Sequence, residues 1–343
     1  GAVALVLLLS REAAAHCSAG CYAQRECLRL VMDVDTGVDD AMALALATSL
    51  PDVCLDAVTV AAGNTNLSTA YDNTLRTLNV VNRTDVPVYR GADRPIDGNL
   101  EYEDTYFGPD NFGGASTQYE TDKNPAADSD TPAYIKIIEL AKKNSGRRSM
   151  VVTAPLTNLA ISLLVNPDFL SDVEPIYILG GTLYGKGNAL PAVDFNFFTD
   201  PEAALVVLQR AACPVTIVPW EAVLHATVPW STYYSITNKT GPLQTFLQDI
   251  TTHTVKCCLG QSPGFNVGDF LAVLAAAVPG SVAHSLEQRV DVELCGAYTR
   301  GQLLHAWQPN MLPHVKRNVT VVQLFNVDVV EEYFKRTFDP PPD

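Results

Sequence analysis

The sequence predicts an α/β protein with an open, mostly parallel central sheet flanked by helices. Apolar, β-branched runs alternate with helical patterns from about residue 28 onward, which is typical of this fold class. The chain has 343 residues, enough to bury a large core. Its hydrophobic content of 47%, beside 18% charged residues, favours a globular protein over a disordered one.

The predicted strands are short apolar runs of the kind that parallel sheets bury on both faces. In chain order they are Leu28–Val34, Leu55–Ala61, Ser149–Thr153, Pro175–Leu179 and Val215–Val218. The tail segments Gln288–Cys295 and Val319–Val327 are expected to add further strands. Parallel strands joined through helices require right-handed crossovers, and ligand sites in such sheets gather at the carboxyl ends of the strands.

The segments between these strands have the spacing of amphipathic or buried helices. The predicted helices are Asp39–Leu50, Ser68–Val81, Pro132–Lys143, Leu156–Val165, Pro201–Leu208 and Phe270–Ala277. Residues 92–131 are rich in Gly, Asp, Asn and Pro and predict a long loop at the rim of a site. No repeat or Pro/Ser-rich linker interrupts the pattern, so residues 28–338 are expected to form a single domain.

Charge and hydropathy exclude two classes of partner. The formal net charge is −15 and no basic run exceeds a pair, so binding to polyanionic nucleic acid is not expected. No segment after the N-terminus has the 18 or more apolar residues of a membrane span, so stable membrane insertion is not expected either. The remaining expectation is a small-molecule ligand.

Several features predict export from the cell. The apolar run Ala2–Leu9, followed by the small residues Ala13–Ala15, is typical of a signal peptide over residues 1–19 whose start is truncated; a buried strand is the alternative. The eight cysteines, at positions 17, 21, 27, 54, 213, 257, 258 and 295, are an even number, as a disulfide framework requires. N-glycosylation sequons begin at Asn66, Asn82, Asn238 and Asn318. We therefore expect a secreted protein.

The segment Asp33-Val-Asp35-Thr-Gly37-Val-Asp39-Asp40 holds four carboxylates in eight residues, between a predicted strand and a predicted helix. Carboxylates this close repel one another, so some must stay protonated or a cation must lie among them. Capping of the following helix explains one or two of these acids but not four. Carboxylate oxygens are the ligands that hard divalent cations prefer, so the segment is the candidate site of chemistry.

Polar residues also follow the other predicted strands, where a small ligand could be bound. They include Asn64, the segment Thr153–Asn158, Gly180-Gly181, Asn188, Asp194-Phe-Asn196 and Asp269. Each has an ordinary local explanation, because Asn64 could occupy a turn and Asp269 could cap a helix. Their occurrence at several strand ends is what indicates a shared site.

With these motifs in this order, the chain resembles the inosine-uridine-preferring nucleoside hydrolase family. The signature D-x-D-x-G-x-D-D-A matches Asp33–Ala41, and the resemblance covers roughly residues 29–280. It implies the Rossmann-like nucleoside hydrolase fold and Ca²⁺-dependent hydrolysis of the N-glycosidic bond of ribonucleosides, which yields free base and ribose. It also implies a homodimer or homotetramer.

The same resemblance implies roles for individual residues. Ca²⁺ would be held by Asp35, Asp40, the carbonyl of Thr153 and Asp269, together with the 2′- and 3′-hydroxyls of the ribose and the attacking water. Asp35 would take the proton of that water as general base. The residues expected to fix the sugar hydroxyls are Asp39, Asn64, Asn188, Asp194, Asn196 and Asp269.

The chain departs from the family pattern at two positions. Gly268 stands where many members have a His that protonates the leaving base, and Asp194 stands where a Glu is usual. The sequence therefore names no catalytic acid, and His225, a lone histidine between apolar residues, is interpreted as structural. Aromatic candidates for stacking on a base are Tyr106, Phe107, Trp220, Trp230, Tyr233 and Tyr234. Stacking or activation at N7 favours purine nucleosides as substrates.

Two alternative functions remain open at this point. Asp33-Val-Asp35-Thr36 partly matches the D-x-D-x-T pattern of haloacid dehalogenase-type phosphatases, in which the first Asp is the nucleophile. The Thr comes one position early, however, and no lysine or acidic pair lies at a later strand end. The other alternative is a secreted protein that binds nucleosides without turnover. This alternative is considered because Gly268 replaces the His that protonates the leaving base in many members of the family.

Overall fold

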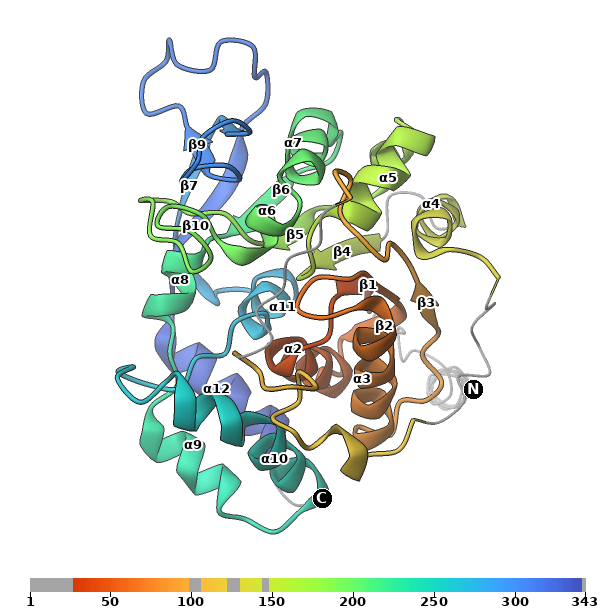
Figure 1. Cartoon of the computed structure of the whole chain (residues 1–343), viewed down its shortest axis with the longest axis vertical. Coiled ribbons are helices and arrows are strands. Elements are labelled where there is room, and N and C mark those ends of the chain that lie inside the picture. The colour runs from red at the N-terminus through yellow and green to blue at the C-terminus, as the bar shows by residue number, and fades with distance from the viewer. Residues whose placement is uncertain (1–26, 99–105, 122–129, 144–147, 341–343) are drawn as a thin grey trace, which may run out of the picture.

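The computed structural model describes residues 27–98, 106–121, 130–143 and 148–340 (Figure 1). Its described strands include an eight-stranded sheet in the order β3-β2-β1-β4-β5-β6-β10-β7. All neighbours in this sheet are parallel except β10 and β7. The strands are β1 (Leu28–Val34), β2 (Val53–Val60), β3 (Val88–Arg90), β4 (Arg148–Val152), β5 (Ile176–Leu179), β6 (Val215–Val218), β7 (Val282–Gln288) and β10 (Val319–Phe325). A separate antiparallel pair joins β8 (Val290–Val292) and β9 (Leu303–His305).

Helices cover both faces of the large sheet (Figure 1). One face carries α4 (Ala133–Lys143), α5 (Thr157–Val165) and α7 (Pro201–Arg210). The other face carries α2 (Val38–Ser49), α3 (Leu67–Val80), α8 (Trp220–His225), α9 (Trp230–Thr237), α10 (Pro242–Cys257), α11 (Phe270–Ala277) and α12 (Val327–Phe338). The short helix α6 (Phe195–Thr199) precedes α7, and 3₁₀ turns lie at Ser116–Gln118 and Phe169–Asp172.

The alternation of side chains along β1 joins the two cores. Leu30 and Met32 pack into the core under α2 and α11, whereas Val31 packs into the core under α4 and α5. All three are almost completely buried, because a central parallel strand has no face toward solvent. This burial on both faces explains why the strand appears in the sequence as an uninterrupted apolar run.

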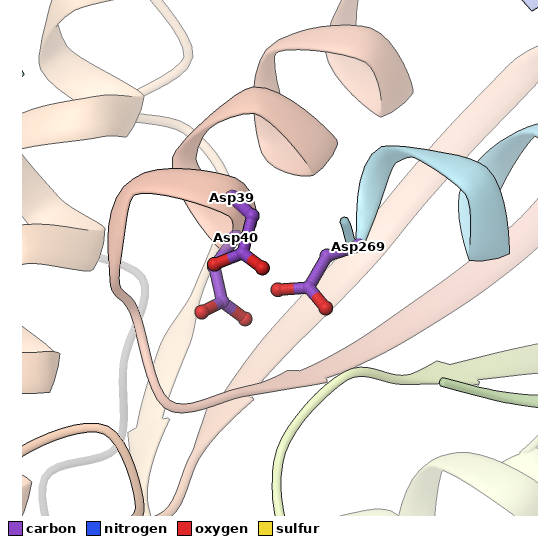
Figure 2. Close-up of side chains that lie close together, drawn as sticks. All are labelled: Asp39, Asp40 and Asp269. Carbon is purple, nitrogen blue, oxygen red and sulfur yellow. The ribbon is translucent and has the colours of Figure 1, made fainter. Parts of the chain in front are cut away.

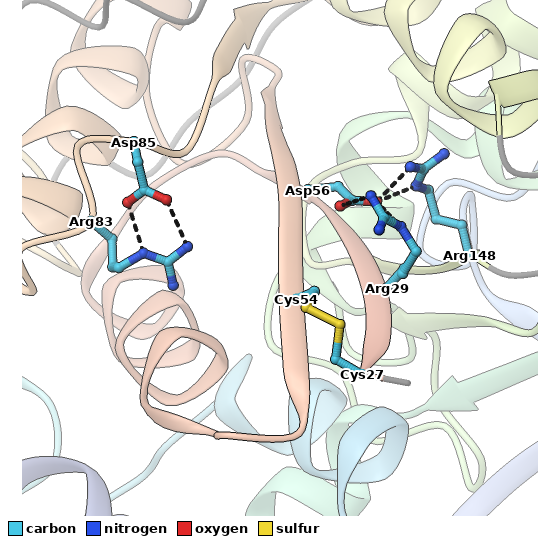
Figure 3. The surroundings of a disulfide bond; sticks show 7 residues. All are labelled: Cys27, Arg29, Cys54, Asp56, Arg83, Asp85 and Arg148. Carbon is cyan, nitrogen blue, oxygen red and sulfur yellow. Dashed lines mark hydrogen bonds and ion pairs between the residues drawn. A yellow bond between two sulfur atoms is a disulfide. The ribbon is translucent and has the colours of Figure 1, made fainter. Parts of the chain in front are cut away.

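The amino ends of β1 and β2 are joined covalently (Figure 3). A disulfide links Cys27 to Cys54, and beside it Asp56 accepts ion pairs from Arg29 at 2.6 Å and from the buried Arg148 at 2.5 Å. Two guanidinium groups therefore compensate the one carboxylate, which a buried charge in a sheet requires. This end of the sheet is held structurally, and the opposite, carboxyl end remains available for a site.

The predicted fold class and alternation of elements are confirmed, with differences in the C-terminal third. Val327 begins α12 rather than ending a strand, and the predicted strand Gln288–Cys295 is instead the end of β7 followed by β8. Helices α8, α9, α10 and α12 have no counterpart among the predicted elements. The described part of residues 92–131 contains a single 3₁₀ turn, as expected for a loop.

The cysteines only partly follow the expected framework. Of the six that the structure describes, four form the bridges Cys27–Cys54 and Cys257–Cys258, while Cys213 is a buried thiol and Cys295 an exposed one. Cys17, Cys21 and the signal-peptide-like segment 1–19 lie outside the described residues. Within the described ranges, no helix combines the length and apolarity that crossing a bilayer requires.

Candidate active site

The acidic segment crosses from the end of β1 into the first turn of α2. Asp33 is still in the strand, Asp35 lies one residue beyond its end, and Asp39 and Asp40 begin the helix. Gly37 occupies the N-cap position and donates its backbone N–H to Asp40 Oδ2 at 3.0 Å. A strand that ends directly above a helix N-terminus therefore concentrates these carboxylates in one place.

A further carboxylate joins them from a distant part of the chain. Asp269 stands at the N-cap position of α11, yet its side chain makes no capping hydrogen bond to that helix. It points instead toward Asp39 and Asp40, and one oxygen of each of the three carboxylates lies within 4.8 Å of the others (Figure 2). The helix-capping interpretation of Asp269 is therefore wrong, and the residue belongs to the acidic cluster.

Thr153 and Asn196 connect the cluster to the ends of β4 and β5. The hydroxyl of Thr153, the residue directly after β4, donates to Asp40 Oδ1 at 2.7 Å. The amide of Asn196 donates to the Thr153 carbonyl at 2.6 Å and to the Leu179 carbonyl at 3.0 Å. These bonds fix the position of the Thr153 carbonyl beside the carboxylates.

Asp35 is held from the end of β2. Its Oδ2 accepts the backbone N–H of Asn64 at 2.6 Å, and the Asn64 amide reaches Asp40 Oδ2 at 3.4 Å. A Cβ at Gly63 would lie 2.1 Å from Asp35 Oδ2, so only glycine allows this close approach. The other oxygen, Asp35 Oδ1, is buried without a hydrogen-bond partner among the described residues, and so is Asp39 Oδ1.

Burial raises the pKa of every carboxyl in the cluster, and repulsion between neighbouring carboxylates adds to this for Asp35, Asp39 and Asp269. Burial raises the pKa of Asp39 to about 8, with repulsion from Asp40 adding to it. The pKa values of Asp35 and Asp269 lie well above the ordinary range, again through burial first and neighbouring carboxylates second. Burial also raises the pKa of Asp40. Such a group of acids ionises readily only beside positive charge.

The residues fit a hard divalent cation. Carboxylate and carbonyl oxygens converge from β1, α2, β4 and α11, and two of the buried oxygens have no partner among the described residues. No lysine, arginine or histidine is among the described residues that line the adjoining pocket. An oxygen-only donor set of this kind matches the preference of Ca²⁺ or Mg²⁺.

Asp33 has different surroundings from the cluster. Its Oδ1 accepts hydrogen bonds from Thr59 at 2.6 Å and from Asn158 at 2.8 Å, and the side chain is fully buried. Burial raises the pKa of Asp33 to about 7. Asp33, Asp35 and Asp40 are all fully buried and lie behind the residues that line the pocket. Asp33 differs from the other two in that both of these side-chain hydrogen bonds come from outside the acidic cluster, from Thr59 and Asn158.

The remaining sugar-binding candidates, Asn188, Asp194 and Asn196, all line the same pocket. Asn188 Oδ1 accepts the Phe195 N–H at 2.8 Å. Asp194 caps α6 by accepting backbone N–H groups of Asn196 and Phe197, and it also accepts that of Gly181. Burial nevertheless raises the pKa of Asp194 to about 7. Its oxygens are thus already engaged with backbone.

Aromatic side chains form much of the pocket wall. Tyr106, Phe107 and Trp220 line it as candidates from the sequence, and Phe195 and Phe265 join them. The Phe107 ring lies against the acidic loop, where a Cβ at Gly37 would be 2.9 Å from it. Trp230, Tyr233 and Tyr234 instead pack against one another around α9 and are not among the lining residues, and His225 is exposed at the end of α8.

Sequence reasoning missed several residues of this pocket. Phe195, Thr254, Leu259, Phe265 and Asn266 all line it. Thr254 lies on α10, a helix that was not predicted, and Leu259 follows that helix. Phe265 and Asn266 shortly precede Asp269 in the chain, but no local pattern indicates that their side chains line the pocket. A pocket with an acidic floor and an aromatic wall can stabilise positive charge and hold a flat, apolar group.

Known proteins with similar sequences and folds point to one family. The sequence model of the family described as inosine-uridine preferring nucleoside hydrolase matches residues 30–332. The pyrimidine-specific ribonucleoside hydrolase RihA of Enterobacter sp. (strain 638) is 30% identical over 276 residues, which cover 80% of this chain and 86% of the relative. The RihA of Escherichia coli (strain K12) is likewise 30% identical over 277 residues, with 80% and 87% covered.

Three solved structures that this fold resembles are also nucleoside hydrolases. An inosine-guanosine nucleoside hydrolase superimposes with a TM-score of 0.84 at 30% identity, and the match covers 92% of this chain and 99% of the other. A plant nucleoside hydrolase, the PpNRh1 enzyme, gives 0.83 at 25% identity, with 91% and 99% covered. A purine-preferring ribonucleoside hydrolase from Gardnerella vaginalis, at 24% identity and a TM-score of 0.81 over 90% and 98% of the chains, shares the fold.

Proposed function

This chain belongs to the inosine-uridine preferring nucleoside hydrolase family, and from that membership we propose that it hydrolyses ribonucleosides in a Ca²⁺-dependent reaction, with purine nucleosides preferred. It is an enzyme that cleaves N-glycosyl bonds, as its relatives are. The observation that carries the metal-dependent part is the convergence of Asp39, Asp40 and Asp269, with the Thr153 hydroxyl bonded to Asp40. Asp39, Asp269 and Thr153 line the aromatic pocket, and Asp40 lies behind them.

The proposed Ca²⁺ ligands are Asp35, Asp40, the Thr153 carbonyl and Asp269. Asp40 is central to the set, because it accepts from Thr153 Oγ1 and lies within reach of Asp269. The tightest carboxylate group includes Asp39 rather than Asp35. The pKa of Asp35 is raised first by burial and then by repulsion from Asp40 and Asp39, so its carboxylate lies near theirs. When bound, the ion supplies the positive charge that keeps these carboxylates ionised and makes a neighbouring water more acidic.

Asp35 is the proposed general base. Its Oδ2 is fixed by the Asn64 N–H, while Oδ1 is buried without a partner among the described residues and is free to accept a proton. The water oxygen forms a bond to C1′ of the ribose as the C1′–N bond breaks, and the water proton passes to Asp35. The electron pair of the broken bond leaves with the base. The carboxylates stabilise the positive charge of the oxocarbenium-like sugar while the C1′–N bond breaks.

The sugar would be oriented by residues on both sides of the acidic floor. Asp39, Asp269 and Asn64 are proposed to contact hydroxyls from the α2 side, and Asn188, Asp194 and Asn196 from the α6 side. The side-chain amide of Asn196 donates hydrogen bonds to two backbone carbonyls. Its side-chain oxygen is therefore the atom that remains to accept a hydrogen bond from a sugar hydroxyl. The Asp194 carboxylate is occupied by backbone N–H groups, so its contact would run through a water.

The purine preference rests on the aromatic wall. Tyr106, Phe107, Trp220 and Phe265 offer flat apolar surface, and the larger ring system of a purine buries more area against it. A pyrimidine-specific and an inosine-guanosine relative are each 30% identical to this chain, so overall similarity favours neither class of base.

The test is a substrate panel. Inosine, guanosine, uridine, cytidine and 2′-deoxyinosine are incubated with the enzyme, with and without a chelator, and the release of free base is followed. We expect turnover of the ribonucleosides, loss of turnover in chelator with recovery on adding Ca²⁺, and little activity on the deoxy substrate. Binding of nucleosides without release of base would contradict the proposal and favour a binding protein. Uridine turned over faster than inosine would refute the purine preference.

We further propose that the protein is a secreted glycoprotein that forms a homodimer or homotetramer. The asparagines of all four sequons, Asn66, Asn82, Asn238 and Asn318, are exposed, which supports glycosylation. The Cys27–Cys54 bridge suits an oxidising compartment. Expression in a secreting eukaryotic cell, a mass shift on enzymatic deglycosylation and light scattering of the product test these statements. A monomer confined to the cytosol would contradict them.

A further inference from the structure

We propose that Asn266 contacts the leaving nucleobase and stabilises it by donating a hydrogen bond from its side-chain amide. This inference rests on the glycosidic reaction proposed above. Breaking the C1′–N bond leaves an electron pair on the base, and the pocket floor is made of carboxylates that oppose extra negative charge. A hydrogen-bond donor facing the base lowers this cost, in the way that preorganised donors stabilise other developing anions.

Most polar side chains of the pocket have no donor to offer. Asp39, Asp194 and Asp269 are acceptors when ionised. Several other polar groups donate to protein atoms: Asn196 to the carbonyls of Thr153 and Leu179, Thr153 to Asp40 Oδ1, Thr254 to the Tyr106 carbonyl, and Asn64 with one of its two N–H groups to Asp40 Oδ2. Among the described lining residues, the side-chain amides of Asn188 and Asn266 have both N–H groups without a protein partner. Asn64 has one of its two N–H groups engaged, and the Trp220 indole N–H is a further donor on the pocket wall. Asn266 is the donor whose direction the turn at Gly268 fixes.

The local structure fixes the direction of the Asn266 amide. Its Oδ1 accepts the backbone N–H of Gly268 at 3.3 Å. Because a backbone N–H can only donate, the oxygen must face Gly268, and the NH₂ group is the end left for the pocket. The preceding residue, Phe265, is anchored by two backbone hydrogen bonds to Val228, at 2.9 and 2.7 Å. Asn266 therefore extends from a fixed strand-like bridge and not from a free loop.

Gly268 cannot supply the missing group itself. Its φ is +44°, and a Cβ built on it would lie 2.3 Å from Asp39 Oδ2. A side chain at this position would displace a carboxylate of the cluster. Asn266, two residues earlier and facing the same pocket, is the polar side chain that the chain offers in its place.

Asn188 lies among the sugar-binding candidates and serves as the matched comparison. Its Oδ1 accepts the N–H of Phe195, next to Asp194 and Asn196. Both asparagines thus have a fixed oxygen and an unused NH₂ group, but Asn188 belongs to the α6 side and Asn266 to the segment between Phe265 and Asp269. Asn188 is thus assigned to the ribose and Asn266 to the base.

The amide of Asn266 donates a hydrogen bond and no proton. The departing base keeps the electron pair of the C1′–N bond and takes its proton from solvent water after leaving. The contribution of Asn266 should therefore depend on how poor the leaving group is. A base with a high pKa needs the hydrogen bond, whereas an aryl leaving group that is stable as an anion does not.

The experiment compares two leaving groups on the same sugar. Wild type, Asn266→Ala, Asn266→Asp and Asn188→Ala are assayed with inosine and with 4-nitrophenyl β-D-ribofuranoside. For inosine, Asn266→Ala should lower kcat/KM by about 100-fold. Its loss on the nitrophenyl riboside should be at least about tenfold smaller. Asn188→Ala should lose similar factors on both substrates. Asn266→Asp keeps the acceptor for the Gly268 N–H, so a selective loss there cannot come from a collapsed turn.

Equal losses on the two substrates for both Asn266 variants would overturn the inference. A wild type that cleaves the nitrophenyl riboside but no nucleoside, or neither, would instead refute the proposed function. In that case calorimetric titration with inosine tests the contact without turnover. Binding that is weakened at least about tenfold by Asn266→Ala would support it, and unchanged binding would overturn it.

Discussion

The carboxylates of Asp40 and Asp269 approach within 4.8 Å although one begins α2 and the other stands at the start of α11. Neither helix needs this arrangement. The side chain of Asp269 faces Asp40 and makes no capping hydrogen bond to the N-terminus of α11. A fold that places two buried acids against each other accepts repulsion that a bound cation removes.

Ca²⁺ should therefore stabilise the wild-type fold. At a Ca²⁺ concentration roughly one hundred times Kd, we expect a gain of about 2.7 kcal/mol in the free energy of unfolding over chelator. Asp269→Asn should lose most of this gain, and in chelator it should be at least as stable as wild type, because a buried repulsion is gone. Thermal unfolding with and without Ca²⁺ measures both quantities.

Asp93→Asn, a change at an exposed acid, is the control and should keep the full gain. An equal gain in Asp269→Asn would exclude this residue as a ligand.

Gly268→Ala should damage the site more than the fold. The added Cβ meets Asp39 Oδ2, and a displacement of that carboxylate by about 1 Å is expected to lower kcat/KM by about 100-fold. Gly280→Ala is the matched control, since its φ of +81° carries a similar backbone penalty but no atom lies within 4 Å of the new Cβ. Both variants should lose about 1–2 kcal/mol of stability. Steady-state kinetics and thermal unfolding separate the effects, and equal activity of the two variants would contradict the argument.

The two acids of the first strand motif should behave differently. Asp35→Asn removes the proposed base and should lower kcat by about 10²- to 10⁴-fold. Asp33→Asn keeps an oxygen for the hydrogen bonds from Thr59 and Asn158, so its kcat should stay within about tenfold of wild type. Single-turnover assays on inosine, with circular dichroism as the check on folding, decide the matter. A larger loss for Asp33→Asn than for Asp35→Asn would reverse the assignment.

The two disulfides should serve different purposes. The Cys27–Cys54 bridge spans a sequence separation of 27, so replacing both cysteines with Ser should cost about 3 kcal/mol of stability and leave KM unchanged. The Cys257–Cys258 bridge joins neighbours and closes no loop. It lies beside the pocket, because Cys257 Sγ is 3.9 Å from the carbonyl of Tyr106.

Replacing Cys257 and Cys258 with Ser should therefore raise KM with little change in the unfolding temperature. The reason is that Tyr106, which lines the pocket, is also held by the Thr254 hydroxyl one turn earlier on α10. Kinetics and thermal unfolding of the two double variants, each with and without reductant, make the comparison. A loss of stability without a change in KM on replacing Cys257 and Cys258 would contradict this prediction.

The N-terminal half of the fold and the acidic segment Asp33–Asp40 could be predicted because their signals are local. A parallel strand buried on both faces gives an unbroken apolar run, as Leu28–Val34 does, and the prediction of that strand agrees with the structure. Helix α10 was missed despite Pro242 at its first turn and buried Phe246, Leu247 and Ile250 at helical spacing. The boundary at Val327 was missed because only Asn326, the N-cap of α12, separates the apolar residues of β10 from those of the helix.

The rest of the site depends on tertiary contacts. Nothing local indicates that Phe107 would pack against Gly37, or that Asp269 would face Asp40 and not cap its helix. Asn266 was missed for the same reason, since its pocket-facing amide is fixed only by the turn at Gly268 and by the backbone pairing of Phe265 with Val228. Sequence patterns identify which residues carry chemistry more readily than they identify which residues shape the space around it.

The distribution of the cluster along the chain also bears on biosynthesis. A ribosome completes β1 and α2 long before it reaches α11. During most of translation Asp40 is therefore present in a chain that does not yet contain Asp269. A fragment that stops short of residue 269 would keep the central strands but not the full set of carboxylates. Only the complete, folded chain should consequently bind Ca²⁺ tightly. Nascent or truncated chains should remain sensitive to proteases at any Ca²⁺ concentration.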